Sequence, residues 1–107
     1  MIKVLITEKK GVLESILIKG HANYDIYGKD IVCASVSALT LCTINNISAL
    51  EDNTIKITMN DNEFKIEVIK ATKINTKLLN NMINLLTELK SDYKDNIDIR
   101  RCADDEV

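Results

Sequence analysis

A short stretch of the sequence, GHANYDIYGKDIVCASVSAL at residues 20–39, gathers the side chains best suited to chemistry. It contains His21, the single histidine of the chain, and Cys33, one of three cysteines, with Asp30 between them. An imidazole beside a thiol supports nucleophilic catalysis, because the imidazole takes the thiol proton and later returns it to a leaving group. The stretch is therefore a candidate site for acyl transfer through a thioester on Cys33.

The position of the cysteine within a predicted helix adds to this interpretation. Residues 31–50 contain no Gly or Pro, and their apolar residues recur at helical spacing. Asp30 precedes them as a good N-cap residue, so Cys33 is the third helical residue, in the first turn. Unpaired N–H groups and the positive end of the helix dipole favour a thiolate there, and are a plausible oxyanion hole. His21 ends a predicted strand twelve residues upstream, and a loop of that length folds back over the helix start.

Each of these residues also has a structural interpretation. A first-turn cysteine in an apolar helix is commonly a small buried hydrophobe, and a histidine at a strand end is commonly a surface residue or a local cap. Asp30 serves as a helix cap whether or not it also orients a histidine. Gly20 and Gly28 flank the polar segment between His21 and Cys33. Taken together, these residues support a Cys–His site about as well as they support the purely structural interpretation.

Metal and redox chemistry find less support. One histidine and three cysteines without C-x-x-C spacing do not easily make a four-ligand zinc site, so neither a metal nor a cofactor is expected. Cys42 lies nine residues beyond Cys33, a rise of about 13 Å along a helix, too far for a disulfide. Cys42 is interpreted as a core residue and Cys102 as incidental.

The remaining elements predict an α+β fold. Alternating residues in two pairs of segments predict two β-hairpins, at 2–8 with 12–19 and at 54–59 with 63–70. Residues 75–93 form an amphipathic helix, and residues 97–100 add a short edge strand. The order ββαββα, with this possible extra strand, predicts an antiparallel sheet of two hairpins with two helices packed on it.

The chain of 107 residues is expected to be one domain, 1–107, with residues 20–30 as an active-site loop and 103–107 as an acidic tail. A net charge of −2 provides no general basic field, so direct nucleic-acid binding is disfavoured. No apolar run is expected to reach the length of a membrane span, and the N-terminus lacks a signal peptide. Together with an odd number of cysteines, this predicts a cytoplasmic protein with reduced thiols.

The predicted helix at 31–50 is apolar on nearly every side, since Ala34, Ala38 and Leu41 lie opposite its main stripe. Such a helix is expected to be buried on more than one side. One sheet does not cover that much apolar surface, and a two-fold homodimer would bury the excess.

The residues of this stretch also resemble a known family. Gly20–His21–Ala22, followed by GKDIVCASVSAL from Gly28 to Leu39, is similar to the signature of the bacterial ribosomal-processing cysteine proteases, the Prp family. Chain length and the order of elements fit as well, so the resemblance covers essentially the whole domain.

The resemblance implies a cytoplasmic homodimer that removes a short N-terminal extension from ribosomal protein twenty-seven of the large subunit. Family members cut after a bulky aromatic residue, so the precursor is the implied peptide substrate. Carried over by position, Cys33 is the nucleophile and His21 the proton donor and acceptor, whereas Asp30 matches an acidic position that caps the helix, orients the histidine, or both.

The resemblance also assigns substrate contacts. It implies that the loop from about Ala22 to Lys29 moves aside or becomes ordered when a peptide enters. Substrate-binding positions are assigned to the loop and the first helical turn: Gly20, Ala22, Gly28 and Ala34.

Two alternatives remain open at this point. One is a non-catalytic dimeric adaptor that binds a ribosomal-protein peptide or a ribosome-assembly partner, in which Cys33 is buried and inert. The other is an enzyme that keeps Cys33 and His21 but acts on another peptide or on a small ester.

Overall fold

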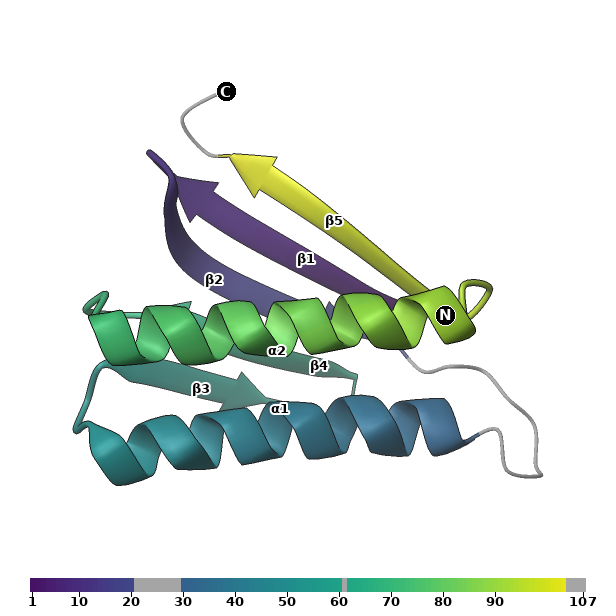
Figure 1. The fold of residues 1–107 in the computed structure, drawn as a ribbon, viewed down its shortest axis with the longest axis horizontal. Helices are drawn as coiled ribbons and strands as arrows, with labels where there is room; N and C mark the ends of the chain where they lie inside the picture. Colours follow the sequence, from purple (N-terminus) through teal and green to yellow (C-terminus); the bar gives the residue numbers. More distant parts are fainter. Residues whose placement is uncertain (21–29, 61, 104–107) are drawn as a thin grey trace.

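The computed structural model describes residues 1–20, 30–60 and 62–103, which form one five-stranded sheet and two helices (Figure 1). The elements follow the predicted order, which confirms the α+β fold. They are β1 (Ile2–Lys9), β2 (Val12–Lys19), α1 (Asp30–Leu50), β3 (Ile55–Met59), β4 (Glu63–Val68), α2 (Lys73–Asp92) and β5 (Ile97–Ala103).

The sheet has the strand order β3-β4-β2-β1-β5. Strands β1 and β2 form one antiparallel hairpin, β3 and β4 form the other, and β2 pairs with β4 to join them. The first hairpin turns through Lys10 and Gly11, whose φ angles of 53° and 78° suit the twist of a two-residue hairpin turn.

Both predicted hairpins are antiparallel, and the predicted extra edge strand makes the five-stranded sheet mixed. Strand β5 lies beside β1 and runs parallel to it, with Ile2 opposite Ile97. Parallel neighbours need a crossover, and α2 supplies it by carrying the chain from β4, near one edge of the sheet, to the opposite edge.

The core lies between one face of the sheet and the two helices, which lie side by side on that face (Figure 1). Buried residues alternate along β1, as a strand with one covered face requires. The same cluster takes residues from β2, β4, β5 and both helices. Its members from α2 are Leu79, Met82, Ile83 and Leu86.

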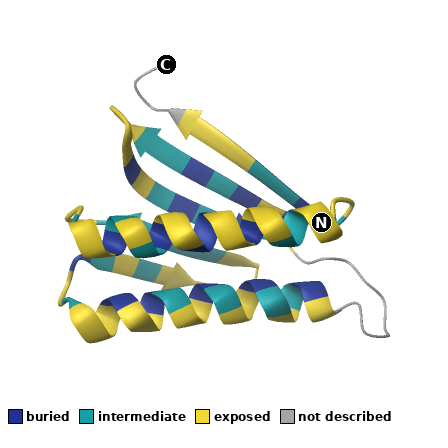
Figure 2. Ribbon diagram, in the orientation of Figure 1, coloured by how far each residue is buried: buried dark blue, intermediate teal, exposed yellow. Residues whose placement is uncertain are grey.

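Helix α1 is less buried than predicted. A single stripe faces the core, whereas Ile31, Leu41 and Leu50 are exposed (Figure 2). The stripe consists of Val32, Val36, Thr40, Ile44 and Ile47. Among the described residues of the single chain, therefore, none forms a further layer over the outer face of α1, which is buried on one side.

Composition alone places α1 among helices that are able to cross a membrane, contrary to the expectation that no run reaches that length. Residues Ile31–Leu50 have a mean hydropathy of 1.5. Core helices of soluble proteins have the same length and composition, and the buried stripe of α1 belongs to the common core. The hydropathy of α1 is therefore weak support for a membrane location.

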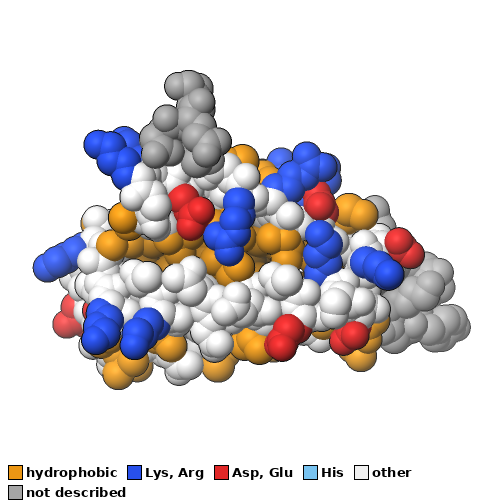
Figure 3. Space-filling model, turned by 45° about the horizontal axis from the view of Figure 1, so that its top comes forward, with side chains coloured by type: hydrophobic (Ala, Val, Ile, Leu, Met, Phe, Trp, Pro, Cys, Tyr) orange, Lys and Arg blue, Asp and Glu red, His pale blue; other side chains and the backbone are white. Residues whose placement is uncertain are grey.

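Charges of both signs are mixed on the surface that Figure 3 draws. Lysine and arginine side chains lie among aspartates and glutamates there, with apolar side chains between them (Figure 3). This mixture agrees with the small net charge of −2.

Side-chain hydrogen bonds join the C-terminal end of α1 to its neighbours. The Oε1 atom of Glu51 accepts hydrogen bonds from the hydroxyls of Thr54, at 3.0 Å, and Thr72, at 2.8 Å. Asn75 is fully buried; its Oδ1 accepts from the N–H of Thr72 at 3.1 Å, and its Nδ2 donates to the carbonyl of Lys70 at 2.9 Å. The hydroxyl of Thr72 also accepts from the N–H of Asn75, which completes a capping box at the start of α2.

Candidate active site

The N-terminal end of α1 places Cys33 close to the start of the helix. The helix begins at Asp30 itself, one residue earlier than predicted, so Asp30 is the first helical residue and not the cap, and Cys33 is the fourth. The first N–H groups of a helix have no acceptor within it, and those of Asp30, Ile31 and Val32 lie in the turn that leads to Cys33.

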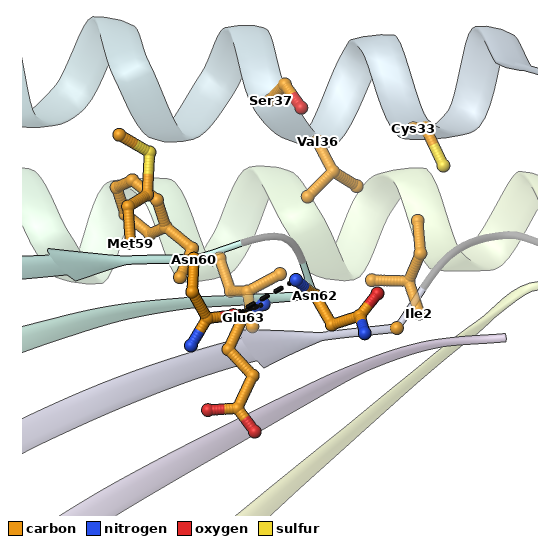
Figure 4. Close-up of a pocket in the computed structure, with 11 residues that line it drawn as sticks. Ile2, Cys33, Val36, Ser37, Met59, Asn60, Asn62 and Glu63 are labelled. Atoms are coloured by element: carbon orange, nitrogen blue, oxygen red, sulfur yellow. Dashed lines mark hydrogen bonds between the residues drawn. The ribbon is translucent and has the colours of Figure 1, made fainter.

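The half-buried side chain of Cys33 lines a cavity of about 220 Å³ between α1 and the sheet (Figure 4). On the α1 side, Cys33 and Val36 point toward the strands, and Ile2 and Asn62 lie across from them (Figure 4). The lining residues are Ile2, Ile18, Gly20, Cys33, Val36, Ser37, Met59, Asn60, Asn62, Glu63 and Phe64. The cavity therefore has an apolar floor, and a polar turn borders it on one side.

The polar side is the β3–β4 turn, and hydrogen bonds fix its position. The Oδ1 atom of Asn60 accepts from the N–H groups of Asn62 and Glu63, both at 3.0 Å. The carbonyl of Asn62 accepts from the N–H of Gly20 at 3.0 Å. The turn is thus attached to the residue that follows β2 and directly precedes His21 in the sequence.

Gly20 occupies a position that excludes larger residues. Its φ angle of 86° lies in the left-handed region, and a Cβ atom added there would lie 2.6 Å from the carbonyl oxygen of Met1. Only glycine satisfies both conditions without a shift of the backbone. The predicted site residue Gly20 therefore does lie at the cavity with Cys33, in a conformation that its residue type explains.

The other predicted site residues fare differently. His21, Ala22 and Gly28 lie outside the described residues, as does the side chain of Asp30, so a Cys–His pair stays a prediction. Ala34 is exposed on α1 and is not among the residues that line the Cys33 cavity.

The remaining two cysteines are exposed and do not line this cavity. None of the three cysteines, all of which are described, forms a disulfide. Cys42 is exposed, so its interpretation as a core residue was wrong, and Cys102 is exposed on β5. Within residues 1–20, 30–60 and 62–103, no group of three or more His, Cys, Asp or Glu side chains is arranged to hold a metal ion.

Sequence reasoning missed the contribution of the β3–β4 hairpin. The segment at 60–62 was recognised only as a turn, yet Asn60, Asn62 and Glu63 line the cavity with Met59 and Phe64. The hairpin reaches the site because β4 pairs with β2, which sets Glu63 opposite Lys19. Periodicity within each strand does not reveal which strands pair, so no local signal identified these residues.

Comparisons with known proteins show the family to which this chain belongs. The model of a family described as cysteine protease Prp matches residues 1–98. The ribosomal processing cysteine protease Prp of Staphylococcus aureus is 33% identical over 101 residues, which cover 91% of this chain and 95% of that protein. The protein of the same name from Bacillus subtilis is 30% identical over 95 residues, covering 82% and 84% of the two chains.

A solved structure is similar over the same length. The crystal structure of the ribosomal processing protease Prp from S. aureus, in complex with a covalently linked product peptide, matches with a TM-score of 0.88 and 29% identity. The match covers 95% of this chain and all of that chain. By sequence and by fold, this chain belongs to the Prp family of cysteine proteases.

Proposed function

We propose that this cysteine protease removes the N-terminal extension of ribosomal protein twenty-seven of the large subunit, cutting after a bulky aromatic residue. The observation that carries the proposal is the position of Cys33, half-buried at the start of α1 with its side chain in a cavity. Its relatives are named ribosomal processing proteases, and one was crystallised with a covalently linked product peptide.

The proposed reaction forms and then hydrolyses a thioester. His21 takes the proton of Cys33, and the sulfur attacks the carbonyl carbon of the peptide bond. Collapse of the tetrahedral intermediate breaks the carbon–nitrogen bond, and His21 gives the proton to the leaving amine. A water molecule, activated by His21, then hydrolyses the thioester and returns the thiol.

The start of α1 has a role in this reaction. The N–H groups of its first turn, which have no acceptor within the helix itself, are suited to stabilise the oxyanion of each tetrahedral intermediate. The positive end of the helix dipole favours the thiolate at Cys33 as well. Asp30 acts mainly at the helix start, because its negative charge would oppose the thiolate if it lay beside the sulfur.

We further propose that the protein acts as a homodimer in the cytoplasm. The exposed apolar residues of α1, which include Ile31 and Leu41, would be covered by a second copy. A cytoplasmic location suits three cysteines without disulfides. Sedimentation velocity at micromolar concentration should give a dimer, and a stable monomer would remove the dimer from the proposal.

The proposed function is tested with a synthetic peptide that spans the extension and the first residues of the mature ribosomal protein. Mass spectrometry should find two products, separated after an aromatic residue. The matched variants are Cys33→Ser, which should leave the peptide intact, and Cys42→Ser, which should cut it like wild type. An intact peptide that binds wild-type protein would instead support the adaptor, and cleavage of unrelated peptides at the same rate would support a different substrate.

A further inference from the structure

Two adjoining hollows lie at the opposite end of the molecule from Cys33. The first, of about 400 Å³, lies between the β1–β2 turn and the first turns of α2, and the second, of about 370 Å³, lies between the same turn and the end of β4. They share Val12, Leu13 and Ala71 and so form one continuous depression, which we name the basic hollow. Thr72, which borders it, is hydrogen-bonded to Glu51 at the far end of α1, roughly 25 Å along the helix from Cys33.

Lysine side chains border the basic hollow on two sides. Lys9 and Lys10 come from the β1–β2 hairpin, and Lys73 and Lys77 come from α2. Lysine and arginine side chains are visible at this end of the molecule, on the left of Figure 3. Within the described residues, none of these four lysines takes part in an ion pair.

The carboxylates beside the hollow do not balance this charge. Glu8 also borders the hollow, but it is paired with Arg101 at 3.4 Å. Glu14 is the other carboxylate among the described residues that line the hollow. Four lysines and one carboxylate outside an ion pair leave an excess of positive charge, which is complementary to an anionic partner.

The floor of the basic hollow is apolar. Val12, Leu13 and Ala71 are joined there by Val68 and Ile69 at the end of β4. Val12 is 50% exposed and Ile69 is 63% exposed, so both side chains are in contact with water. An apolar side chain of a partner would remove this surface from water, whereas a small inorganic anion would not.

A peptide fits this combination better than a nucleic acid does. None of the described residues that line the hollow is aromatic, so bases would find no ring on which to stack. The net charge of −2 provides no general field to hold a long polyanion. A peptide carries acidic and apolar side chains a few ångströms apart, as a lysine rim around an apolar floor requires.

We propose that the basic hollow is a docking site for an acidic segment of a partner protein, with an apolar side chain among its carboxylates. Because the hollow lies at the other end of α1 from Cys33, the Cys33 cavity stays open while the partner is bound. The inference does not depend on the proposed function, since docking at the hollow requires no reaction at Cys33.

Fluorescence anisotropy with a labelled peptide of Asp and Glu around a central Leu tests the proposal. A second peptide has Ser in place of Leu, a third has Lys in place of the acidic residues, and a single-stranded RNA carries the same negative charge. Wild-type protein should bind the first peptide saturably, and at least about fivefold more tightly than each of the others at the same salt concentration.

Two lysine variants separate the hollow from the overall charge. Lys9→Gln with Lys73→Gln removes two charges from the rim, and Lys3→Gln with Lys94→Gln removes two charges elsewhere. All four lysines are exposed, so both double variants should fold. The first should weaken binding of the Leu peptide by at least about fivefold, and the second by less than about twofold.

A second matched pair tests the apolar floor. Ile69 and Leu50 are each 63% exposed, but only Ile69 lines the hollow. Ile69→Ser should remove most of the preference for the Leu peptide over the Ser peptide, because both changes delete the same contact. Leu50→Ser should keep the wild-type preference.

Several results would overturn the proposal. Equal affinities of the two lysine variants would show that only the overall charge matters, and equal binding of the Leu and Ser peptides would exclude the apolar floor. Tighter binding of the RNA, lost in the Lys9 and Lys73 variant, would assign the hollow to a nucleic acid. A change of oligomeric state in that variant, without a change in peptide binding, would assign it to a second copy. If wild type binds no peptide, the docking site is rejected, and binding that appears after removal of residues 104–107 would assign the hollow to the acidic end of the chain itself.

Discussion

The C-terminal end of α1 is held by side-chain hydrogen bonds, whereas its N-terminal end borders a cavity. Glu51 joins the start of β3 and the cap of α2 to the end of α1, and Asn75 has its amide oxygen and nitrogen paired in the interior. At the other end, Cys33 is half-buried beside 220 Å³ of space and next to the β3–β4 turn. The same helix therefore meets a closed polar network at one end and an open site at the other.

The two ends of α1 therefore have different roles: one end stabilises the fold, and the other end is the site of the proposed chemistry. A buried network that satisfies its polar groups fixes the position of α1 against α2 and the sheet. A site for a peptide has to leave space and polar groups for its ligand, and such regions contribute little to folding. Substitutions at the two ends should therefore change different measurements.

The largest expected effect is at the open end. Cys33→Ser and His21→Ala should each lower kcat for the precursor peptide by at least about a thousandfold, as removal of a nucleophile or its base does. Cys33→Ser should keep its Tm, because the two side chains have nearly the same shape. Cys42→Ser provides the control, and its exposed position predicts unchanged activity and unchanged Tm. Similar activity of the Cys33→Ser and Cys42→Ser variants would show that Cys33 is not the nucleophile.

The next effect is at the closed end. Asn75→Ala leaves the N–H of Thr72 and the carbonyl of Lys70 without their partner and opens a small cavity, so the free energy of unfolding should fall by about 2–4 kcal/mol. Urea denaturation measures the loss, and kcat of the folded protein should stay the same. Asn84→Ala, at an exposed position on α2, should change stability by less than about 0.5 kcal/mol. Equal stability of the two variants would show that the network is unimportant.

Gly20→Ala should affect both measurements, because Gly20 belongs to the fold and to the cavity. Gly11→Ala is the control, because both glycines have positive φ angles. A Cβ atom added at Gly20 would collide with the carbonyl oxygen of Met1, whereas one added at Gly11 would meet no atom within 4 Å. Gly11→Ala should cost about 1 kcal/mol from backbone strain. Gly20→Ala should cost about 2 kcal/mol and also lower kcat/KM, because a shift at Met1 or Gly20 disturbs the bond to Asn62. Equal Tm values and equal activities of the two variants would indicate that the end of β2 shifts to accommodate the added methyl group without cost.

The smallest expected effect is that of Asp30→Asn. Asp30 is the first residue of α1, where a negative charge adds only about 0.3–1 kcal/mol through the helix dipole, so the variant should have a nearly unchanged Tm and keep most of its activity. Circular dichroism melting and the peptide assay give the two values. A loss of kcat by orders of magnitude in a stably folded variant would instead assign the charge of Asp30 to the orientation of His21.

The sequence predicted each helix and strand better than it predicted which of them lie side by side in the fold. Alternation and helical spacing located all five strands and both helices to within a few residues, since these periods are local properties of the backbone. The parallel pairing of β5 with β1 and the approach of the β3–β4 turn to Gly20 depend on long-range pairing, which no local period contains.

The cysteines illustrate the same limit. Helix α1 is apolar on several faces, so periodicity alone did not select the face that packs on the sheet, and Cys42 was wrongly assigned to the core. Nine residues at about 100° each place Cys42 on the opposite side of the helix from Cys33. This geometry was available from the sequence, but only the packing shows which of the two cysteines faces the cavity.

The most direct test of the account is the rate at which each thiol reacts with iodoacetamide at neutral pH, followed by peptide mass spectrometry. Exposure alone predicts that Cys42 and Cys102 react faster than half-buried Cys33. The account predicts the reverse, with Cys33 at least about tenfold faster, because the helix start favours its anion and His21 accepts its proton. A Cys33 that reacts more slowly than both exposed cysteines would contradict the assignment of Cys33 as the nucleophile.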